Sequence, residues 1–101
     1  MKSRIMYLES KEGGLIGPGR IGRVTFSKTG GTIYYQGRSF RRVRGFKHNY
    51  EDVETHEPYW ISGPKRDGHD ALYGGNSPVE VDEDVRVEYW RDIRRRIEKR
   101  A

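Results

Sequence analysis

The sequence predicts a single α+β domain, a small and strongly curved antiparallel β-sheet followed by one C-terminal α-helix. Three observations lead to this fold class. Short alternating runs separated by glycine turns fill residues 4–62, an irregular loop follows over residues 63–78, and an apolar repeat of every fourth residue begins near residue 82. A length of 101 residues fits one domain, residues 1–101.

The first half of the chain predicts a meander of strands. Residues 4–9 and 20–27 alternate between apolar and polar side chains, and a glycine-rich loop over residues 13–19 separates them. The paired glycines Gly30 and Gly31 accept the positive φ that a hairpin turn needs, so residues 32–35 are expected to return as a third strand.

A two-residue turn at Gln36-Gly37 then fixes the register of the next strand, residues 38–43. In that register Tyr35 lies opposite Arg38 and Ile33 lies opposite Phe40, so the apolar members share a core face. The opposite face carries Arg23, Thr25, Tyr34 and Arg41.

A second hairpin is expected around residues 55–57, between strands at 50–54 and 59–62. The helix is expected over about residues 82–98, because acidic residues open it and basic residues close it, as the helix dipole favours. Val85, Tyr89, Ile93 and Ile97 form its apolar stripe. Five or so short strands joined by glycine turns also allow closure into an SH3-like barrel.

The composition excludes several classes of protein. There is no cysteine, which removes disulfides, thiolate metal sites and cysteine nucleophiles. The sequence has no apolar run long enough to span a membrane and no secretory signal, so we expect a cytoplasmic protein. The 12% of aromatic residues must supply much of the core.

The net charge of +5 is unevenly distributed along the chain. Residues 1–50 carry +9, residues 51–84 carry −8, and residues 85–101 carry +4. Such a pattern indicates either a basic binding face or complementary segments that meet in the fold.

Two weaker patterns have simpler structural explanations. The run Gly17 to Gly22 loosely imitates a phosphate-binding GxGxxG motif, but a strand follows it, which favours a turn or bulge. His48, His56 and His69 match no compact set of metal ligands, so we expect no metal and no cofactor.

Catalysis is a minor alternative. Ser62, His69 and Asp70 could be written as a triad, and Glu51, Asp52, Glu54 and Glu57 could contain an acid/base pair. A small ribonuclease-like enzyme would be the natural form of this alternative, but we expect no enzyme and no catalytic residues.

The basic strand segment favours binding of RNA or DNA, because arginine neutralises phosphate and exposed rings stack on unpaired bases. The candidate nucleic-acid-binding residues are Arg23, Tyr34, Arg38, Arg41, Arg42 and Arg44. The alternative is an adaptor that docks a protein partner through Tyr59, Trp60, Lys65, Arg66 and Tyr73. Pairing of the arginines with the acidic middle segment would weaken the first hypothesis.

Several stretches resemble a group of short bacterial proteins with no established activity. They include Ile21 to Gly30, Tyr34 to Arg38, Asp52 to Thr55, Tyr59 to Lys65 and Leu72 to Gly74. Such proteins sometimes carry the name of deoxyxylulose-phosphate synthase, a thiamine-diphosphate enzyme whose metal–diphosphate motif this sequence lacks. The resemblance implies a bacterial, cytoplasmic protein and no mechanism.

Overall fold

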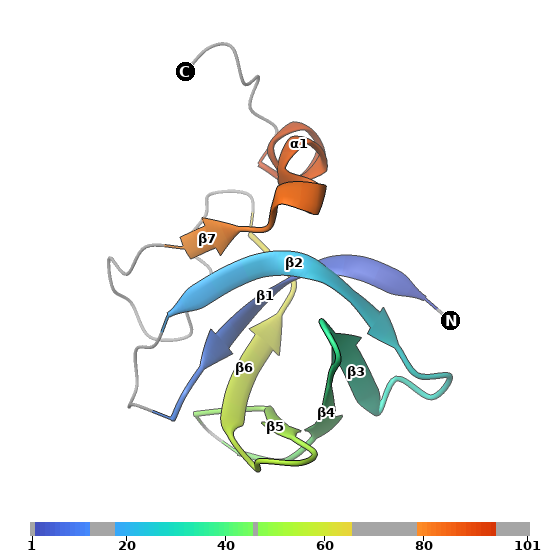
Figure 1. Cartoon of the computed structure of the whole chain (residues 1–101), viewed down its shortest axis with the longest axis vertical. Helices are drawn as coiled ribbons and strands as arrows, with labels where there is room; N and C mark the ends of the chain where they lie inside the picture. Colours follow the sequence, from blue (N-terminus) through green and yellow to red (C-terminus); the bar gives the residue numbers. More distant parts are fainter. Residues whose placement is uncertain (1, 13–17, 46, 66–78, 95–101) are drawn as a thin grey trace.

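A computed structural model describes residues 2–12, 18–45, 47–65 and 79–94. Six antiparallel strands close into a small barrel, because β1 pairs with both β6 and β2, and a seventh strand and a short helix are added to it (Figure 1). The strands are β1 (Ser3–Ser10), β2 (Gly19–Phe26), β3 (Thr32–Tyr35), β4 (Arg38–Arg42), β5 (Tyr50–Asp52), β6 (Pro58–Ser62) and β7 (Val79–Val81). The expected curved sheet with one C-terminal helix is confirmed at this level.

The predicted register of the β3–β4 hairpin is confirmed. Ile33 lies opposite Phe40, and Tyr35 lies opposite Arg38. The turn residues Gln36 and Gly37 both have positive φ, at 47° and 79°. This is the geometry of the tight hairpin turn whose twist matches that of its strands.

The core has two layers that share strand β1. One face of β1 points into the barrel, where Met6 and Leu8 join the interior cluster around Ile33 and Phe40. The other face packs Ile5 and Tyr7 beneath the C-terminal segment. A strand buried on both faces explains why the alternation of residues 4–9 is weak in the sequence.

The C-terminal helical segment changes its winding along its length. A 3₁₀ turn, η1 (Glu83–Val85), leads into α1 (Arg86–Glu88) and then into a π-helical turn, η2 (Tyr89–Ile93). Val85 and Tyr89 of the predicted stripe are buried against β1 and β2, whereas Ile97 and the rest of the predicted helix beyond residue 94 lie outside the described residues.

Strand β7 was not expected from the sequence. It pairs in parallel with the first half of β2, Gly19 opposite Val79, and falls in the stretch between the expected loop and the expected helix. Of the loop predicted over residues 63–78, residues 63–65 have no regular structure and the remainder lies outside the described residues. Within the described part of the chain, no helix is long and apolar enough to cross a membrane.

Two glycines of the glycine-rich segment lie inside β2, where they permit close packing. A Cβ atom on Gly19 would lie 2.6 Å from the ring of Tyr7, and one on Gly22 would lie 2.5 Å from Oδ2 of Asp82 and 2.6 Å from Cε1 of Tyr35. These two glycines therefore have a packing role, and the segment over residues 13–17 lies outside the described residues.

We predict that Gly22→Ala lowers the free energy of unfolding by about 1–3 kcal/mol, because the methyl group has no space beside Asp82 and Tyr35. Urea unfolding followed by tryptophan fluorescence measures the change. Gly31→Ala is the matched control, since its Cβ would find its nearest neighbour at 3.5 Å, at Thr29 Oγ1. Equal losses in the two variants would contradict the packing explanation.

Candidate nucleic-acid interface

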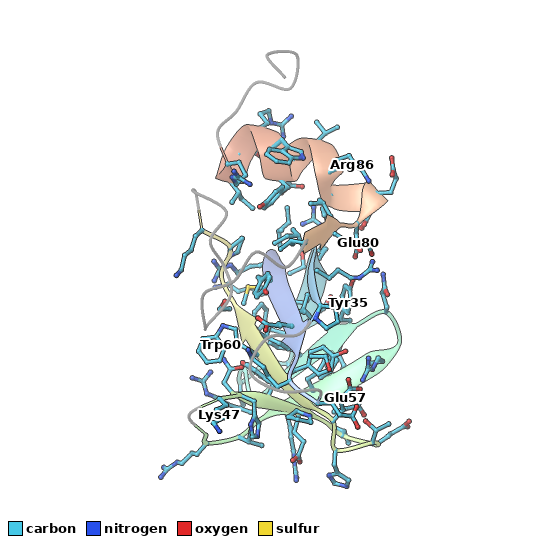
Figure 2. The ribbon with its side chains drawn as sticks, turned by 90° about the vertical axis from the view of Figure 1, so that its left-hand side faces the viewer. Tyr35, Lys47, Glu57, Trp60, Glu80 and Arg86 are labelled. Carbon is cyan, nitrogen blue, oxygen red and sulfur yellow. The ribbon has the colours of Figure 1, made fainter. Side chains whose placement is uncertain are left out.

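The antiparallel barrel divides the chain reversals between two ends. One end, which we call the basic end, gathers residues 2–4, the 27–31 hairpin turn, residues 42–45 and 47–49 at the end of β4 and before β5, and residues 62–65 at the end of β6 and after it. The other, which we call the pocket end, gathers the β3–β4 turn and the β5–β6 turn at 53–57. Figure 2 shows Lys47 and Glu57 on opposite sides of the barrel.

Hydrogen bonds hold the segments of the basic end, or the residues next to them, beside one another. The bonds run from Phe26 N to Lys2 O at 2.8 Å, from Arg42 N to Gly31 O at 3.0 Å, from Val43 N to Asn49 O at 3.0 Å, and from Asn49 Nδ2 to Ile61 O at 2.8 Å. The basic end is thus one connected surface.

The segments of the basic end carry lysines and arginines but no acidic residue. Their seven lysines and arginines are all exposed: Lys2, Arg4, Lys28, Arg42, Arg44, Lys47 and Lys65. No ion pair joins the first six to a carboxylate of the described residues. Arg42 lies over the ring of Tyr50, with its Cζ 5.8 Å from the centroid. The positive charge of these six side chains is therefore not cancelled by an ion pair within the described part of the chain.

Arg38, one of the predicted nucleic-acid-binding residues, is instead held at the pocket end. Its Nε donates to Asp52 Oδ2 at 2.8 Å, and its Nη2 donates to Glu57 Oε1 at 2.8 Å. Its Nη1 donates to Tyr59 Oη at 2.9 Å, and the guanidinium lies 5.1 Å from the ring centroids of both Phe40 and Tyr59. Each of the three guanidinium nitrogens donates a hydrogen bond within the protein, so Arg38 has a structural role.

Three other predicted residues lie on the outer face of β2–β3–β4. Arg23 pairs with Glu88 of the helix, and Arg41 pairs with Glu51 at 3.2 Å. Tyr34 is 40% exposed. The structure therefore brings Arg23, Tyr34 and Arg41 to one face, places Arg42 and Arg44 at the basic end, and separates Arg38 from both.

The pocket end carries the acidic middle segment. Asp52 accepts from the backbone N–H of Thr55 at 3.0 Å and from that of Glu54 at 2.8 Å, in addition to Arg38. The Thr55 N–H, with Arg38 and the Glu54 N–H, holds the pKa of Asp52 below its ordinary value. The complementary segments of the sequence therefore do meet in the fold, at this end through Arg38 and on the outer face through Arg41 and Glu51.

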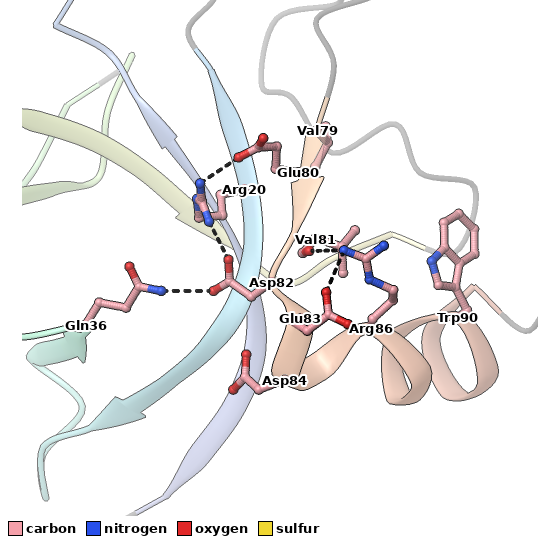
Figure 3. Close-up of a pocket in the computed structure, with 10 residues that line it drawn as sticks. All are labelled: Arg20, Gln36, Val79, Glu80, Val81, Asp82, Glu83, Asp84, Arg86 and Trp90. Carbon is pink, nitrogen blue, oxygen red and sulfur yellow. Dashed lines mark hydrogen bonds and ion pairs between the residues drawn. The ribbon is translucent and has the colours of Figure 1, made fainter.

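The hydrogen bonds of Asp82 connect the C-terminal segment to the barrel at the pocket end. Asp82 accepts from Arg20 Nη1 at 2.6 Å and from Tyr35 Oη at 2.5 Å, and burial together with this bond raises the pKa of Tyr35. Arg20, Asp82 and Glu80 line a pocket of about 780 Å³. Figure 3 shows Arg20 between Asp82 and Glu80. The carboxylates of Asp82 and Glu80 are both occupied by Arg20, so this pocket presents an internally satisfied network.

The residues of the adaptor hypothesis do not form one exposed patch. Tyr59 packs on the barrel core, and Trp60 is partly buried against the second cluster beneath the helix. Lys65 is exposed at the basic end, while Arg66 and Tyr73 lie outside the described residues.

The structure also separates two of the histidines considered for catalysis or metal binding. His48 belongs to the β4–β5 connection and His56 to the β5–β6 turn, at opposite ends of β5. His69 and Asp70 lie outside the described residues. Among the residues that are described, no group of three His, Cys, Asp or Glu side chains could hold a metal ion.

Comparison of the chain with protein-family models, curated proteins and solved structures gave no match.

We predict that Asp52→Asn lowers the free energy of unfolding at pH 7 by about 1–3 kcal/mol, because an amide cannot accept as strongly from the Arg38 guanidinium. The pKa of Asp52 is depressed in the folded state, so its stabilisation is present above the unfolded-state pKa of about 4 and is lost as the pH falls through the folded-state pKa. Urea unfolding at several pH values should therefore show a flatter acid limb for Asp52→Asn than for the wild type.

Glu54→Gln is the matched control, since it removes an exposed carboxylate from the same turn. An acid limb that is unchanged by Asp52→Asn, or flattened equally by Glu54→Gln, would contradict the role given to Asp52.

Proposed function

We propose that this protein is a charge-driven nucleic-acid-binding module without catalytic activity, built on a barrel of the SH3-like class. The contact surface is the basic end. It includes Arg42 and Arg44 of the residues that the sequence suggested, together with Lys2, Arg4, Lys28, Lys47 and Lys65.

The observation that carries this proposal is the segregation of charge between the two ends of the barrel. Seven exposed bases and no acid occupy the segments of one end, while Asp52 and Glu57 of the middle segment bind Arg38 at the other. A solvated surface that only confers solubility usually mixes the two signs. Clustered cations release counterions when they neutralise phosphates, which drives binding with little dependence on base sequence.

The chemistry of the side chains agrees with a phosphate ligand. Arginine presents a planar fork that matches phosphate oxygens, and lysine adds mobile point charges. The basic end carries arginine and lysine on loops and strand ends, which a ligand can approach most easily. Weak base specificity follows, because contacts to phosphate carry no direct sequence information.

We predict that the double variant Arg44→Ala/Lys47→Ala binds an oligonucleotide more weakly and with a smaller salt dependence. Each lost phosphate contact should reduce the slope of log K against log salt by about 0.7–0.9. Fluorescence anisotropy of a labelled oligonucleotide of mixed sequence, titrated at several salt concentrations, measures both quantities.

The matched control is Arg86→Ala/Arg91→Ala, which removes the same charge from the helix beside Glu83 and Asp92. Its slope should equal that of the wild type. If the two double variants weaken binding equally, net charge rather than the basic end is responsible. No binding by the wild type at low salt would reject the proposed function.

A further inference from the structure

We infer that the nucleic acid bound is single-stranded, and that Tyr34 is the platform on which one of its bases stacks. This inference rests on the proposed function and adds the strandedness of the ligand and a second contact surface. The surface is the outer face of β2–β3–β4, next to the basic end, which we call the outer platform; it is formed by Arg23, Thr25, Thr32, Tyr34, Ser39 and Arg41.

Tyr34 is unusual among the aromatic residues of the described chain. The other described tyrosines, phenylalanines and tryptophans are buried or half-buried, whereas Tyr34 is 40% exposed. Its side chain forms no hydrogen bond, ring contact or cation–π contact with the described residues. An exposed ring on a rigid strand costs little ordering entropy when a base stacks on it.

The neighbours of Tyr34 leave the ring accessible. Thr25 lies directly opposite it on β2, and Ser39 lies directly opposite it on β4. Both side chains are small and end in hydroxyl groups, which can bond to a sugar or a phosphate but cannot cover an aromatic ring. The platform is therefore flat around its one ring.

Cations flank the ring diagonally on the neighbouring strands. Arg23 is two residues before Thr25 on β2, and Arg41 is two residues after Ser39 on β4. Their ion pairs with Glu88 and Glu51 lie at the surface. Exposed pairs of this kind contribute about 0–1 kcal/mol, so a phosphate can replace the carboxylate partner at little cost.

The platform is continuous with the basic end. Tyr34 is the third residue after Gly31 of the 27–31 turn, and three steps of extended chain span about 10 Å. Ser27 N donates to Thr32 O at 2.9 Å, which closes this hairpin and holds Lys28 beside the platform. A strand whose phosphates lie on the basic end can therefore place a base over Tyr34.

A duplex cannot use this platform in the same way. Its bases are already stacked on both faces and paired at their edges, whereas an unpaired base gains stacking on a protein ring. Charge alone would bind both forms, so preference for the single strand depends on Tyr34.

The test compares wild type, Tyr34→Ala and Tyr34→Phe in fluorescence anisotropy titrations with one labelled oligonucleotide, single-stranded or annealed to its complement. We expect the wild type to prefer the single strand. Tyr34→Ala should weaken single-strand binding about 5- to 150-fold, the range that base–aromatic stacking provides, and should leave duplex binding unchanged. Tyr34→Phe keeps the ring and should keep the affinity.

Urea unfolding of each variant verifies that the fold is intact. Photocrosslinking with a bromouridine-containing single strand should label Tyr34 in the wild type. If the wild type binds both forms equally and Tyr34→Ala changes neither, the inference is overturned while the proposed function stands. Absence of all binding at low salt would reject the proposed function itself.

Discussion

The hydrogen bonds of Arg38 with Asp52, Glu57 and Tyr59 determine how charge is distributed between the two ends of the barrel. The proposed binding surface depends on that distribution. The cluster around Arg38 brings part of the basic first half of the chain against the acidic middle segment, at the pocket end of the barrel. Because the strands are antiparallel, successive reversals of the chain alternate between the two ends of the barrel. The segments at the basic end contain no Asp or Glu, and six of their bases form no ion pair with a carboxylate of the described residues: Lys2, Arg4, Lys28, Arg42, Arg44 and Lys47.

Much of the barrel could be predicted from local signals. Gly37 accepts the positive φ that the two-residue turn at Gln36-Gly37 requires, and a turn fixes every cross-strand pair beyond it. The apolar spacing of Val85 and Tyr89 likewise predicts which side of the helical segment is buried. Strand β7 carries no such signal: three residues are too few to show alternation, and its pairing depends on a distant strand.

The candidate site, like the barrel, could be predicted only where the signal lies in neighbouring residues of the sequence. Sequence alone identifies the excess of arginine, but which arginines are neutralised depends on contacts across the barrel. Arg38 and Phe40 alternate with Ser39 and Arg41, so neighbours in the sequence point to different sides of the sheet. Lys2, Arg4 and Lys28 did not stand out, because they are scattered in the sequence and meet only when the strand ends converge.

The central claim is that nucleic acid contacts the basic end. The most direct measurement is a titration of the isotope-labelled protein with a single-stranded oligonucleotide, followed through its backbone amide chemical shifts. We expect shifts to concentrate in residues 2–4, 27–31, 42–45, 47–49 and 62–65 and to extend to Tyr34, while residues 53–57 of the pocket end stay unchanged. Shifts confined to the pocket end would contradict the proposed contact.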